Sequence, residues 1–220
     1  MCIPLAVVFD LDGTLLDTLP DIATSCNHAL QQFGLPTLPE EQIRGYVGDG
    51  AITLISRATR LSDDDPLLHK VFAAYMQHYV EHPIEKTRWM PHATETIAML
   101  APLPLAICTN KPRTIVDRIL RTLGAADRFV VVVGEGDVAR SKPAPDALLL
   151  VAEKLAVAPQ QLVMVGDGPQ DVLCGKSVGA RTIAVTGGFA STDVLRTLEP
   201  DVLLDSLAEV PDVVRRWRSS

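Results

Sequence analysis

Residues 7–18 read VVFDLDGTLLDT and place two carboxylates directly after an apolar run. The run ends at Asp10, the second carboxylate follows at Asp12, and Gly13 permits a sharp turn. In open α/β sheets, ligands bind beyond the carboxyl ends of the strands, and paired carboxylates there suit a hard cation. A D-G pair is also an ordinary turn signal, so D-x-D-G alone leaves a polar turn and a metal site equally open.

Short apolar runs recur along the chain and predict a parallel sheet. We expect strands at residues 5–9, 103–108, 129–133, 162–165 and 182–185. These runs are apolar throughout rather than alternating, which is typical of strands covered on both faces. Ile115, Ile119 and Leu123 recur at helical spacing before Gly124, and a similar pattern follows from Leu148. Strand, helix and strand in repetition predict an α/β fold with a Rossmann-like parallel sheet.

The segment between the first two predicted strands is helical in pattern and contains no convincing strand. Thr18 and Asp21 have the spacing of a capping box that begins a helix, and Gly34 ends it. Later, Leu68, Phe72, Tyr75 and Tyr79 form a stripe that we interpret as packing rather than as a ligand site. We therefore expect a helical cap domain at residues 17–83, inserted into a core of residues 1–16 and 84–220.

The composition is that of a globular protein with an acidic balance. The chain has 220 residues, of which 47% are hydrophobic and 21% charged, and its net charge is −7. This charge argues against nucleic-acid binding and against binding to an anionic membrane surface. It leaves an anionic substrate possible, because a bound metal reverses the local field.

The spacing of the cysteines and the length of the apolar segments indicate the cellular compartment of the protein. Cys2, Cys26, Cys108 and Cys174 form no C-x-x-C pair, so we expect free thiols in a reducing compartment. No apolar stretch approaches the ~20 residues of a membrane span, and the N-terminus lacks the basic lead of a signal peptide. These features predict a cytoplasmic protein.

Polar residues also follow or flank three of the later predicted strands. Thr109 and Asn110 stand in CTNKP, and the hydroxyl and nearby backbone N–H groups there can hold phosphoryl oxygens. Lys142 stands in SKPAP, just before the start of a predicted helix, where the helix dipole also favours an anion. Asp167 and Asp171 stand in GDGPQD, four residues apart, so one helical turn brings them to one side.

Each of these residues has an ordinary structural interpretation as well. Thr109 can cap a helix, a lone lysine is usually a solvated surface residue, and Asp167 can belong to a D-G turn. The occurrence of all four motifs in order is what favours a functional site over chance.

The four motifs together resemble those of the haloacid-dehalogenase-like hydrolase superfamily over nearly the whole chain. VVFDLDGTLLDT is similar to its first motif, and the closest likeness is to the phosphoglycolate phosphatase branch, whose members carry a helical cap after that motif. The resemblance implies that Asp10 is the nucleophile and Asp12 the general acid and base. Since the dehalogenases lack the second Asp, Asp12 favours phosphate chemistry.

The same resemblance assigns the remaining core residues. It implies that Thr109 and Lys142 bind the phosphoryl group, and that Mg²⁺ is held by Asp10, Asp167 and the backbone carbonyl of Asp12. Asp171 would bind the metal directly or through a second shell. One departure is Gly168, where relatives often carry Ser or Thr.

A glycine-rich stretch in the predicted cap is the candidate substrate loop. Residues 44–51 read RGYVGDGA, so Gly48 and Gly50 leave backbone N–H groups open to an anion, and Arg44 could meet a carboxylate. A plain glycine-rich turn is an equally valid interpretation of the stretch, and for Arg44 a surface position is the favoured interpretation. The expected substrate-binding set is Thr109, Asn110, Lys142, Arg44, Gly48 and Gly50.

The sequence therefore predicts a Mg²⁺-dependent phosphatase that acts on a small-molecule phosphomonoester, with 2-phosphoglycolate as the favoured substrate. Another sugar-phosphate phosphatase, a pyrophosphatase or a phosphosugar mutase is the alternative within the superfamily. A phospho-accepting receiver domain and a catalytically silent binding protein are the non-enzyme alternatives. We expect neither a nucleic-acid nor a membrane partner, and a monomer or homodimer.

Overall fold

A six-stranded parallel sheet forms the centre of the molecule. The computed structural model describes residue 3 and residues 5–219. The strands are β1 (Ala6–Phe9), β4 (Leu105–Pro112), β5 (Val131–Glu135), β6 (Leu162–Gly166), β7 (Arg181–Val185) and β8 (Val202–Leu204). They are arranged in the order β5-β4-β1-β6-β7-β8, and each neighbouring pair is parallel.

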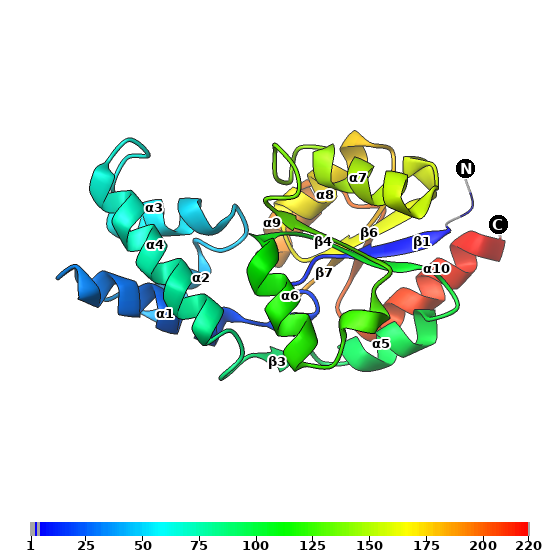
Figure 1. Ribbon diagram of the computed structural model, residues 1–220. Coiled ribbons are helices and arrows are strands. Elements are labelled where there is room, and N and C mark those ends of the chain that lie inside the picture. Colours follow the sequence, from blue (N-terminus) through cyan, green and yellow to red (C-terminus); the bar gives the residue numbers. More distant parts are fainter. Residues whose placement is uncertain (1–2, 4, 220) are drawn as a thin grey trace.

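Helices cover both faces of this sheet (Figure 1). One face packs against α7 (Asp146–Leu155), α8 (Pro169–Ser177) and α9 (Thr192–Thr197), and the other against α5 (Ala93–Leu100), α6 (Arg113–Thr122) and α10 (Val210–Ser219). Alternate residues of β1 enter the two cores: Val8 lies in one cluster with Leu148, and Phe9 lies in the other with Ile115. This two-sided burial explains why the strands are apolar throughout, and it confirms the predicted α/β fold.

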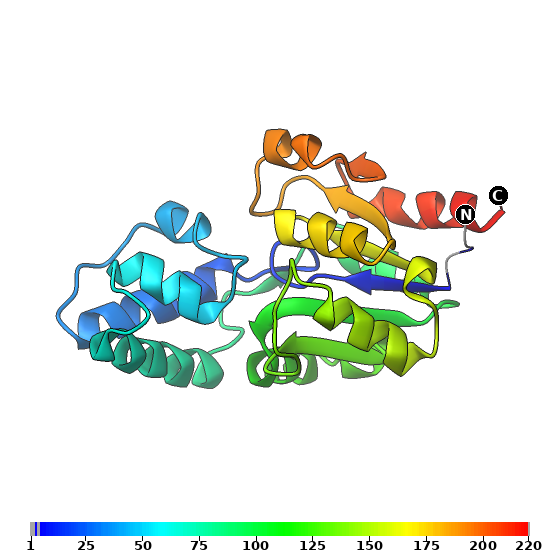
Figure 2. The same ribbon diagram turned by 90° about the horizontal axis from the view of Figure 1, so that it is seen from above.

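Four helices form a separate layer beyond the carboxyl ends of the strands, seen in Figures 1 and 2. They are α1 (Leu19–Gln32), α2 (Glu40–Arg44), α3 (Ala51–Thr59) and α4 (Pro66–Glu81), and we call them the helical unit. Leu16 and Leu19 carry the apolar core of the sheet into that of the helical unit without a break. The division of the chain at 16/17 and 83/84 stays a prediction.

The two chain segments that lead into and out of the helical unit pair with each other. β2 (Leu16–Asp17) and β3 (Arg88–Trp89) form a two-stranded antiparallel ribbon. Asp21, at the start of α1, accepts hydrogen bonds from the backbone N–H of Lys86 and from both the N–H and the hydroxyl of Thr87. The start of the helical unit is therefore tied to the segment by which the chain returns to the sheet.

The sequence-based expectations fail at three small features. β2, β3 and β8 were not predicted, because strands of two or three residues are too short to show a periodicity. β4 continues to Pro112, four residues beyond the predicted end at 108. The capping box at Thr18 is wrong: the Thr18 hydroxyl makes no cap hydrogen bond and instead donates to Asp12 Oδ1 at 2.7 Å.

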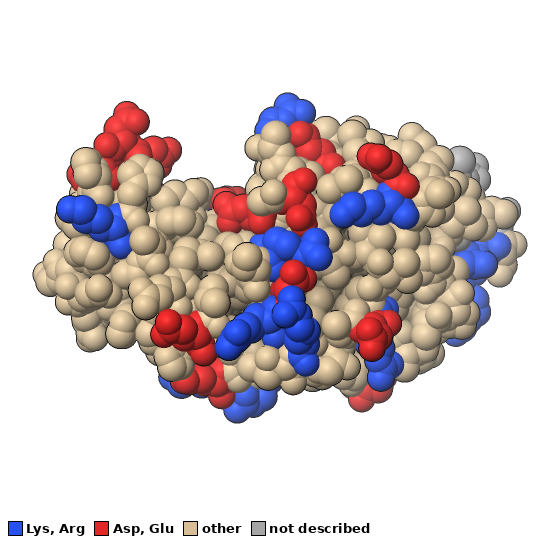
Figure 3. Space-filling model, viewed as in Figure 1, with Lys and Arg blue, Asp and Glu red and all other residues tan. Residues whose placement is uncertain are grey.

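Charged side chains of both signs are interspersed over the face shown in Figure 3, and an indentation separates the helical unit from the sheet part. Within the described residues, no helix has both the length and the apolar character needed to cross a bilayer. Cys26, Cys108 and Cys174 are buried free thiols, and Cys2 lies outside the described residues. The remaining short helical turns are η1 (Ala126–Arg128), η2 (Pro159–Gln161) and η3 (Leu207–Glu209).

Candidate active site

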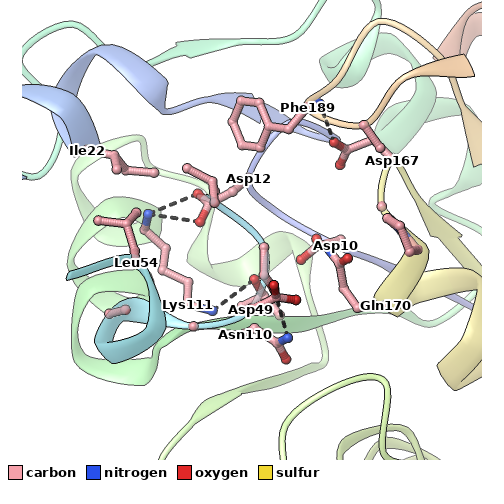
Figure 4. A pocket seen from close by; sticks show the side chains of 18 of the residues that line it. Asp10, Asp12, Ile22, Asp49, Leu54, Asn110, Lys111, Asp167, Gln170 and Phe189 are labelled. Carbon is pink, nitrogen blue, oxygen red and sulfur yellow. Dashed lines mark hydrogen bonds and ion pairs between the residues drawn. The ribbon is translucent and has the colours of Figure 1, made fainter. Parts of the chain in front are cut away.

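A cavity of about 440 Å³ lies between the carboxyl edge of the sheet and the helical unit. Its walls come from the ends of β1 and β4, the start of α8, the loop after β7 and the loop between α2 and α3. Figure 4 shows side chains from these separate elements pointing into one space. The cavity therefore lies where ligands bind in open α/β sheets.

Three buried carboxylates meet at one end of this cavity. Asp10 follows β1, and Asp167 and Asp171 follow β6, which is the neighbouring strand in the sheet. One oxygen of each lies within 4.8 Å of the others. Asp10 Oδ1 accepts no hydrogen bond from any described residue, although Lys142 Nζ lies 3.1 Å away as an ion-pair partner. Hard oxygen donors that converge in this way suit a divalent cation such as Mg²⁺.

Asp167 is held rigidly in this cluster. The Thr14 hydroxyl donates to Oδ1 at 2.5 Å, and the Phe189 N–H donates to Oδ2 at 2.7 Å. Burial, and then the charges of Asp10 and Asp171, raise the pKa of Asp167 to about 8. A cation between these carboxylates would relieve the same repulsion, so the residues fit a metal.

Lys142 bridges two of the carboxylates. Its Nζ lies 3.1 Å from Asp10 Oδ1 and 2.6 Å from Asp171 Oδ1, and it donates to the Cys108 carbonyl at 2.6 Å. Burial alone would lower the pKa of Lys142, but Asp10 and Asp171 outweigh it and raise the pKa. The Gly168 N–H donates to the second oxygen of Asp171, so both oxygens of that carboxylate accept hydrogen bonds from neighbouring residues. Asp10 Oδ1, by contrast, accepts none from the described residues.

The carboxylate of Asp12 lies outside this acidic cluster. It accepts hydrogen bonds from Lys111 Nζ at 2.9 and 3.1 Å and from the Thr18 hydroxyl at 2.7 Å. Metal binding through the Asp12 side chain would require these contacts to break. The expected metal contact of Asp12 through its backbone carbonyl stays a prediction.

Lys111 and Tyr79 belong to the site, although the sequence analysis did not single out Lys111 and assigned Tyr79 to packing. Lys111 is buried, and its Nζ also donates to the Tyr79 hydroxyl at 2.6 Å. Burial lowers the pKa of Lys111, against the opposing effect of Asp12. No local signal in the sequence marks Lys111, because the residues that pair with it, Asp12 and Tyr79, lie far from it in the chain.

Thr109 and Asn110 are both buried in the cavity wall. The Thr109 hydroxyl faces the cavity and accepts a long hydrogen bond, 3.3 Å, from the Lys111 N–H. The Asn110 side chain bonds to the backbone instead: it donates to the carbonyls of Gly48 and Lys142 and accepts from the Lys142 N–H. Asn110 therefore fixes the position of Lys142 and of the glycine-rich loop.

The loop between α2 and α3 closes one side of the cavity. Gly48 and Gly50 line it, and the Glu135 carboxylate accepts the N–H of Ala51 at the start of α3. The Arg44 guanidinium donates to the Gly188 carbonyl at 2.5 Å and lies over the Phe189 ring. The loop and the end of the sheet are thus already in contact in this structure.

The Gln170 side chain occupies the space that a larger side chain at position 168 would need. A Cβ at position 168 would lie 2.2 Å from the amide nitrogen of Gln170, which also lines the cavity. Gln170 is a flexible side chain, so a Ser or Thr here would require it to move. Position 168 carries no carboxylate, and the acidic cluster is complete without it.

Comparisons with known proteins agree with this geometry. A family model described as "Haloacid dehalogenase-like hydrolase" matches residues 7–185. A phosphoglycolate phosphatase of Chromobacterium violaceum is 35% identical over 216 residues, which cover 96% of each chain. A phosphoglycolate phosphatase of Escherichia coli strain K12 is 35% identical over 93% of this chain and 90% of its own.

Solved structures resemble this one over almost the whole chain. A predicted phosphoglycolate phosphatase from Haemophilus somnus 129PT superposes with a TM-score of 0.90 at 28% identity, covering 97% of this chain and 99% of its own. CbbY from Rhodobacter sphaeroides, in complex with phosphate, has a TM-score of 0.81 at 27% identity and covers 94% of this chain and 96% of its own. The similarity therefore includes the helical unit as well as the sheet.

Proposed function

Because the chain belongs to the haloacid dehalogenase-like hydrolase family and is a phosphatase of its phosphoglycolate phosphatase branch, we propose that it hydrolyses 2-phosphoglycolate to glycolate and phosphate. The observation that carries the proposal is the convergence of Asp10, Asp12 and Thr109 on one cavity beside an acidic cluster, with Lys142 paired to Asp10. The names of the most similar curated relatives support the choice of substrate.

The proposed reaction has two steps, both centred on Asp10. A carboxylate oxygen of Asp10 forms a bond to phosphorus while the bond to the ester oxygen breaks, and Asp12 gives its proton to that oxygen. Water then attacks phosphorus, the bond to Asp10 breaks, and Asp12 takes the proton from the water. Atoms and charges balance over the cycle, and Asp10 and Asp12 return to their starting states.

Lys142 and Thr109 act on the phosphoryl oxygens in this proposal. Lys142 Nζ is already 3.1 Å from the nucleophilic carboxylate, so it orients Asp10 and offsets the charge of the approaching phosphate. The Thr109 hydroxyl lines the same cavity and can donate to a phosphoryl oxygen. Fixed charges and donors of this kind contribute several kcal/mol each to lowering such barriers.

The proposed cofactor is Mg²⁺, held by Asp10 and Asp167, with Asp171 and the backbone carbonyl of Asp12 completing the set. A bound Mg²⁺ lets a carboxylate approach an anionic phosphate and offsets charge on the equatorial oxygens. Without that cation, three buried carboxylates and a phosphate dianion would face, among the described residues, a single adjacent lysine, Lys142.

A panel of phosphomonoesters tests the substrate assignment. Phosphate release would be measured from 2-phosphoglycolate, several sugar phosphates, a nucleotide and pyrophosphate, with Mg²⁺ and with chelator. We expect the highest kcat/KM for 2-phosphoglycolate and loss of activity with chelator. A higher kcat/KM for a sugar phosphate or pyrophosphate would contradict the substrate assignment, and activity that survives chelation would contradict the metal.

We also propose that one chain in the cytoplasm is the catalytic unit, alone or in a homodimer. The three described cysteines are buried free thiols, which suits a reducing compartment. Gel filtration coupled to light scattering, with activity measured across the peak, tests whether a second chain is needed.

A further inference from the structure

Lys111 is a buried cation of the cavity that the proposed reaction leaves without a role. Its side chain is 2% exposed, and it enters from the end of β4 on the far side of Asp12 from the acidic cluster. Its ammonium group has three N–H donors: contacts to the two oxygens of Asp12 and to the Tyr79 hydroxyl occupy them. Lys111 is therefore fully paired as long as Asp12 stays where it is.

Asp12 is held away from the proton transfer that we assign to it. Both of its oxygens accept from Lys111, and Oδ1 also accepts from the Thr18 hydroxyl. To protonate a leaving oxygen, Asp12 must give up part of this pairing. A buried ammonium left without a partner is costly, so Lys111 needs a replacement anion when Asp12 moves.

Among the described residues, the other cations in or beside the cavity are already engaged elsewhere. Lys142 pairs with Asp10 and Asp171, in the region assigned to phosphate and metal. The Arg57 side chain pairs with Asp49 and is 40% exposed at the cavity rim. Arg44 donates to a backbone carbonyl and stacks over an aromatic ring. Lys111 lines the cavity and contacts Asp12. Since Asp12 is the proposed proton donor to the leaving oxygen, Lys111 lies on the side of the cavity where the leaving group would bind.

We propose that Lys111 selects phosphomonoesters whose leaving group carries a carboxylate close to the ester oxygen. The substrate carboxylate takes the place of the Asp12 carboxylate on Lys111 Nζ, and Asp12, with a proton taken from solvent, is released to protonate the leaving oxygen. This inference rests on the proposed function and names the recognition element of the same site. Exchange of one carboxylate for another keeps the charge-assisted hydrogen bonds, which a neutral leaving group cannot replace.

The surroundings of Lys111 restrict the leaving group to a short one. Ile22 and Leu54 flank Lys111 in the cavity wall, as Figure 4 shows, and the Tyr79 ring lies 4.5 Å from Nζ. Directly beside Lys111, the Ile22 and Leu54 side chains offer no hydrogen-bonding group to the hydroxyls of a sugar. A two-carbon acid esterified at its hydroxyl fits this environment better than a sugar does.

Two esters that differ only at the carboxylate test the proposal. In 2-hydroxyethyl phosphate a neutral CH₂OH replaces the carboxylate of 2-phosphoglycolate. For wild type, Lys111→Met and the matched control Lys70→Met, kcat/KM would be measured on both esters with Mg²⁺. Lys70 is exposed on α4. We expect Lys111→Met to reduce the preference for 2-phosphoglycolate by at least about tenfold, since it removes a charge-assisted contact, and Lys70→Met to keep that preference.

The alternative role for Lys111 is to orient Asp12 only. In that case Lys111→Met would lower kcat/KM equally on both esters, the preference would stay at the wild-type value, and the proposal would be overturned. Lys111→Arg provides a second variant that keeps the positive charge: it should retain more of the preference than Lys111→Met. Circular dichroism confirms that each variant folds.

Binding to a variant that cannot turn over separates this inference from the proposed function. By calorimetry, Asp10→Asn should bind 2-phosphoglycolate at least about tenfold more tightly than 2-hydroxyethyl phosphate, and Lys111→Met in that background should remove the difference. If the wild type cleaved neither ester, the proposed function would be wrong. The binding comparison would still decide on Lys111, because a preference that survives Lys111→Met contradicts the inference.

Discussion

At the scale of single residues, Asp10 and Asp12 are two positions apart in the sequence and have different surroundings. Asp10 is buried beside Lys142 and two further carboxylates. Asp12 is held by Lys111 and Thr18 on the other side of the cavity. The turn after β1 therefore separates the carboxylate that we propose as the nucleophile from the one that we propose as the general acid and base.

We predict that Asp10→Asn abolishes phosphate release and keeps the fold. The amide is nearly isosteric with the carboxylate but cannot form the bond to phosphorus, so kcat should fall at least about 10³-fold. Phosphate release and circular dichroism would be measured beside Asp63→Asn, a control at an exposed position before α4. Residual activity near the wild-type value would contradict the nucleophile assignment.

The carboxylate-bearing turn of the first motif was predictable from the sequence, whereas the contacts of Lys111 with Asp12 and Tyr79 were not. Asp10, Asp12 and Gly13 are adjacent in the chain, so their spacing alone indicates a turn that carries carboxylates. The partners of Lys111 are Asp12 and Tyr79, which are 99 and 32 positions away in the sequence. The pattern of neighbouring residues in the sequence does not indicate contacts between residues this far apart in the chain.

At the scale of elements, α1 and α4 pack through a stack of three histidines. The His78 ring lies 4.1 Å from the His28 ring and 4.6 Å from the His82 ring, measured between centroids. Burial, followed by the charges of His28 and His82, lowers the pKa of His78, and Glu81 and Glu85 oppose this only in part. His78 is therefore more readily protonated in the unfolded chain than in the folded one.

We predict that His78 contributes a loss of stability on acidification from pH 7.5 to 5.5, and that His78→Gln removes this contribution. Below the unfolded pKa of about 6.5 the unfolded state binds a proton that folded His78 resists, so the His78 contribution to stability drops as pH falls through this window. The raised pKa of Asp167 acts in the opposite direction in every variant, so the change in midpoint between the two pH values is compared with that of the wild type. The midpoints of wild type, His78→Gln and His69→Gln would be measured at both values, since His69 is exposed on the same helix. An equal change in all three proteins would contradict the prediction.

Long elements were predictable from periodicity and short ones were not. The five predicted strands and the helices that begin near Ile22, Leu68, Ile115 and Leu148 are all present. β8 is a three-residue edge strand, and β2 and β3 owe their existence to the pairing of two linkers far apart in the sequence. The capping interpretation of Thr18 failed because Asp12 competes for its hydroxyl.

At the scale of the whole molecule, the active site depends on both the sheet and the helical unit. The sheet supplies the acidic cluster and Lys142, while α4 supplies Tyr79 and the loop after α2 supplies the cavity wall. Asn110 joins the two parts, because its side chain bonds to Gly48 of the loop and to Lys142. A change in either part should therefore alter substrate recognition as well as stability.

Metal binding should stabilise the entire fold, because the buried cluster of Asp10, Asp167 and Asp171 brings negative charges together. A ligand that binds only the folded state at 100 times its Kd adds about 2.7 kcal/mol, which for a chain of this size raises the thermal midpoint by roughly 5–10 °C. We predict such a rise with Mg²⁺ and its reversal by chelator. Asp167→Asn should remove the rise and Asp63→Asn should keep it, in thermal melts at constant ionic strength. A Mg²⁺-dependent rise that persists in Asp167→Asn would mean that the cation binds elsewhere, since the Asp167 carboxylate is the one anchored by both Thr14 and the loop after β7.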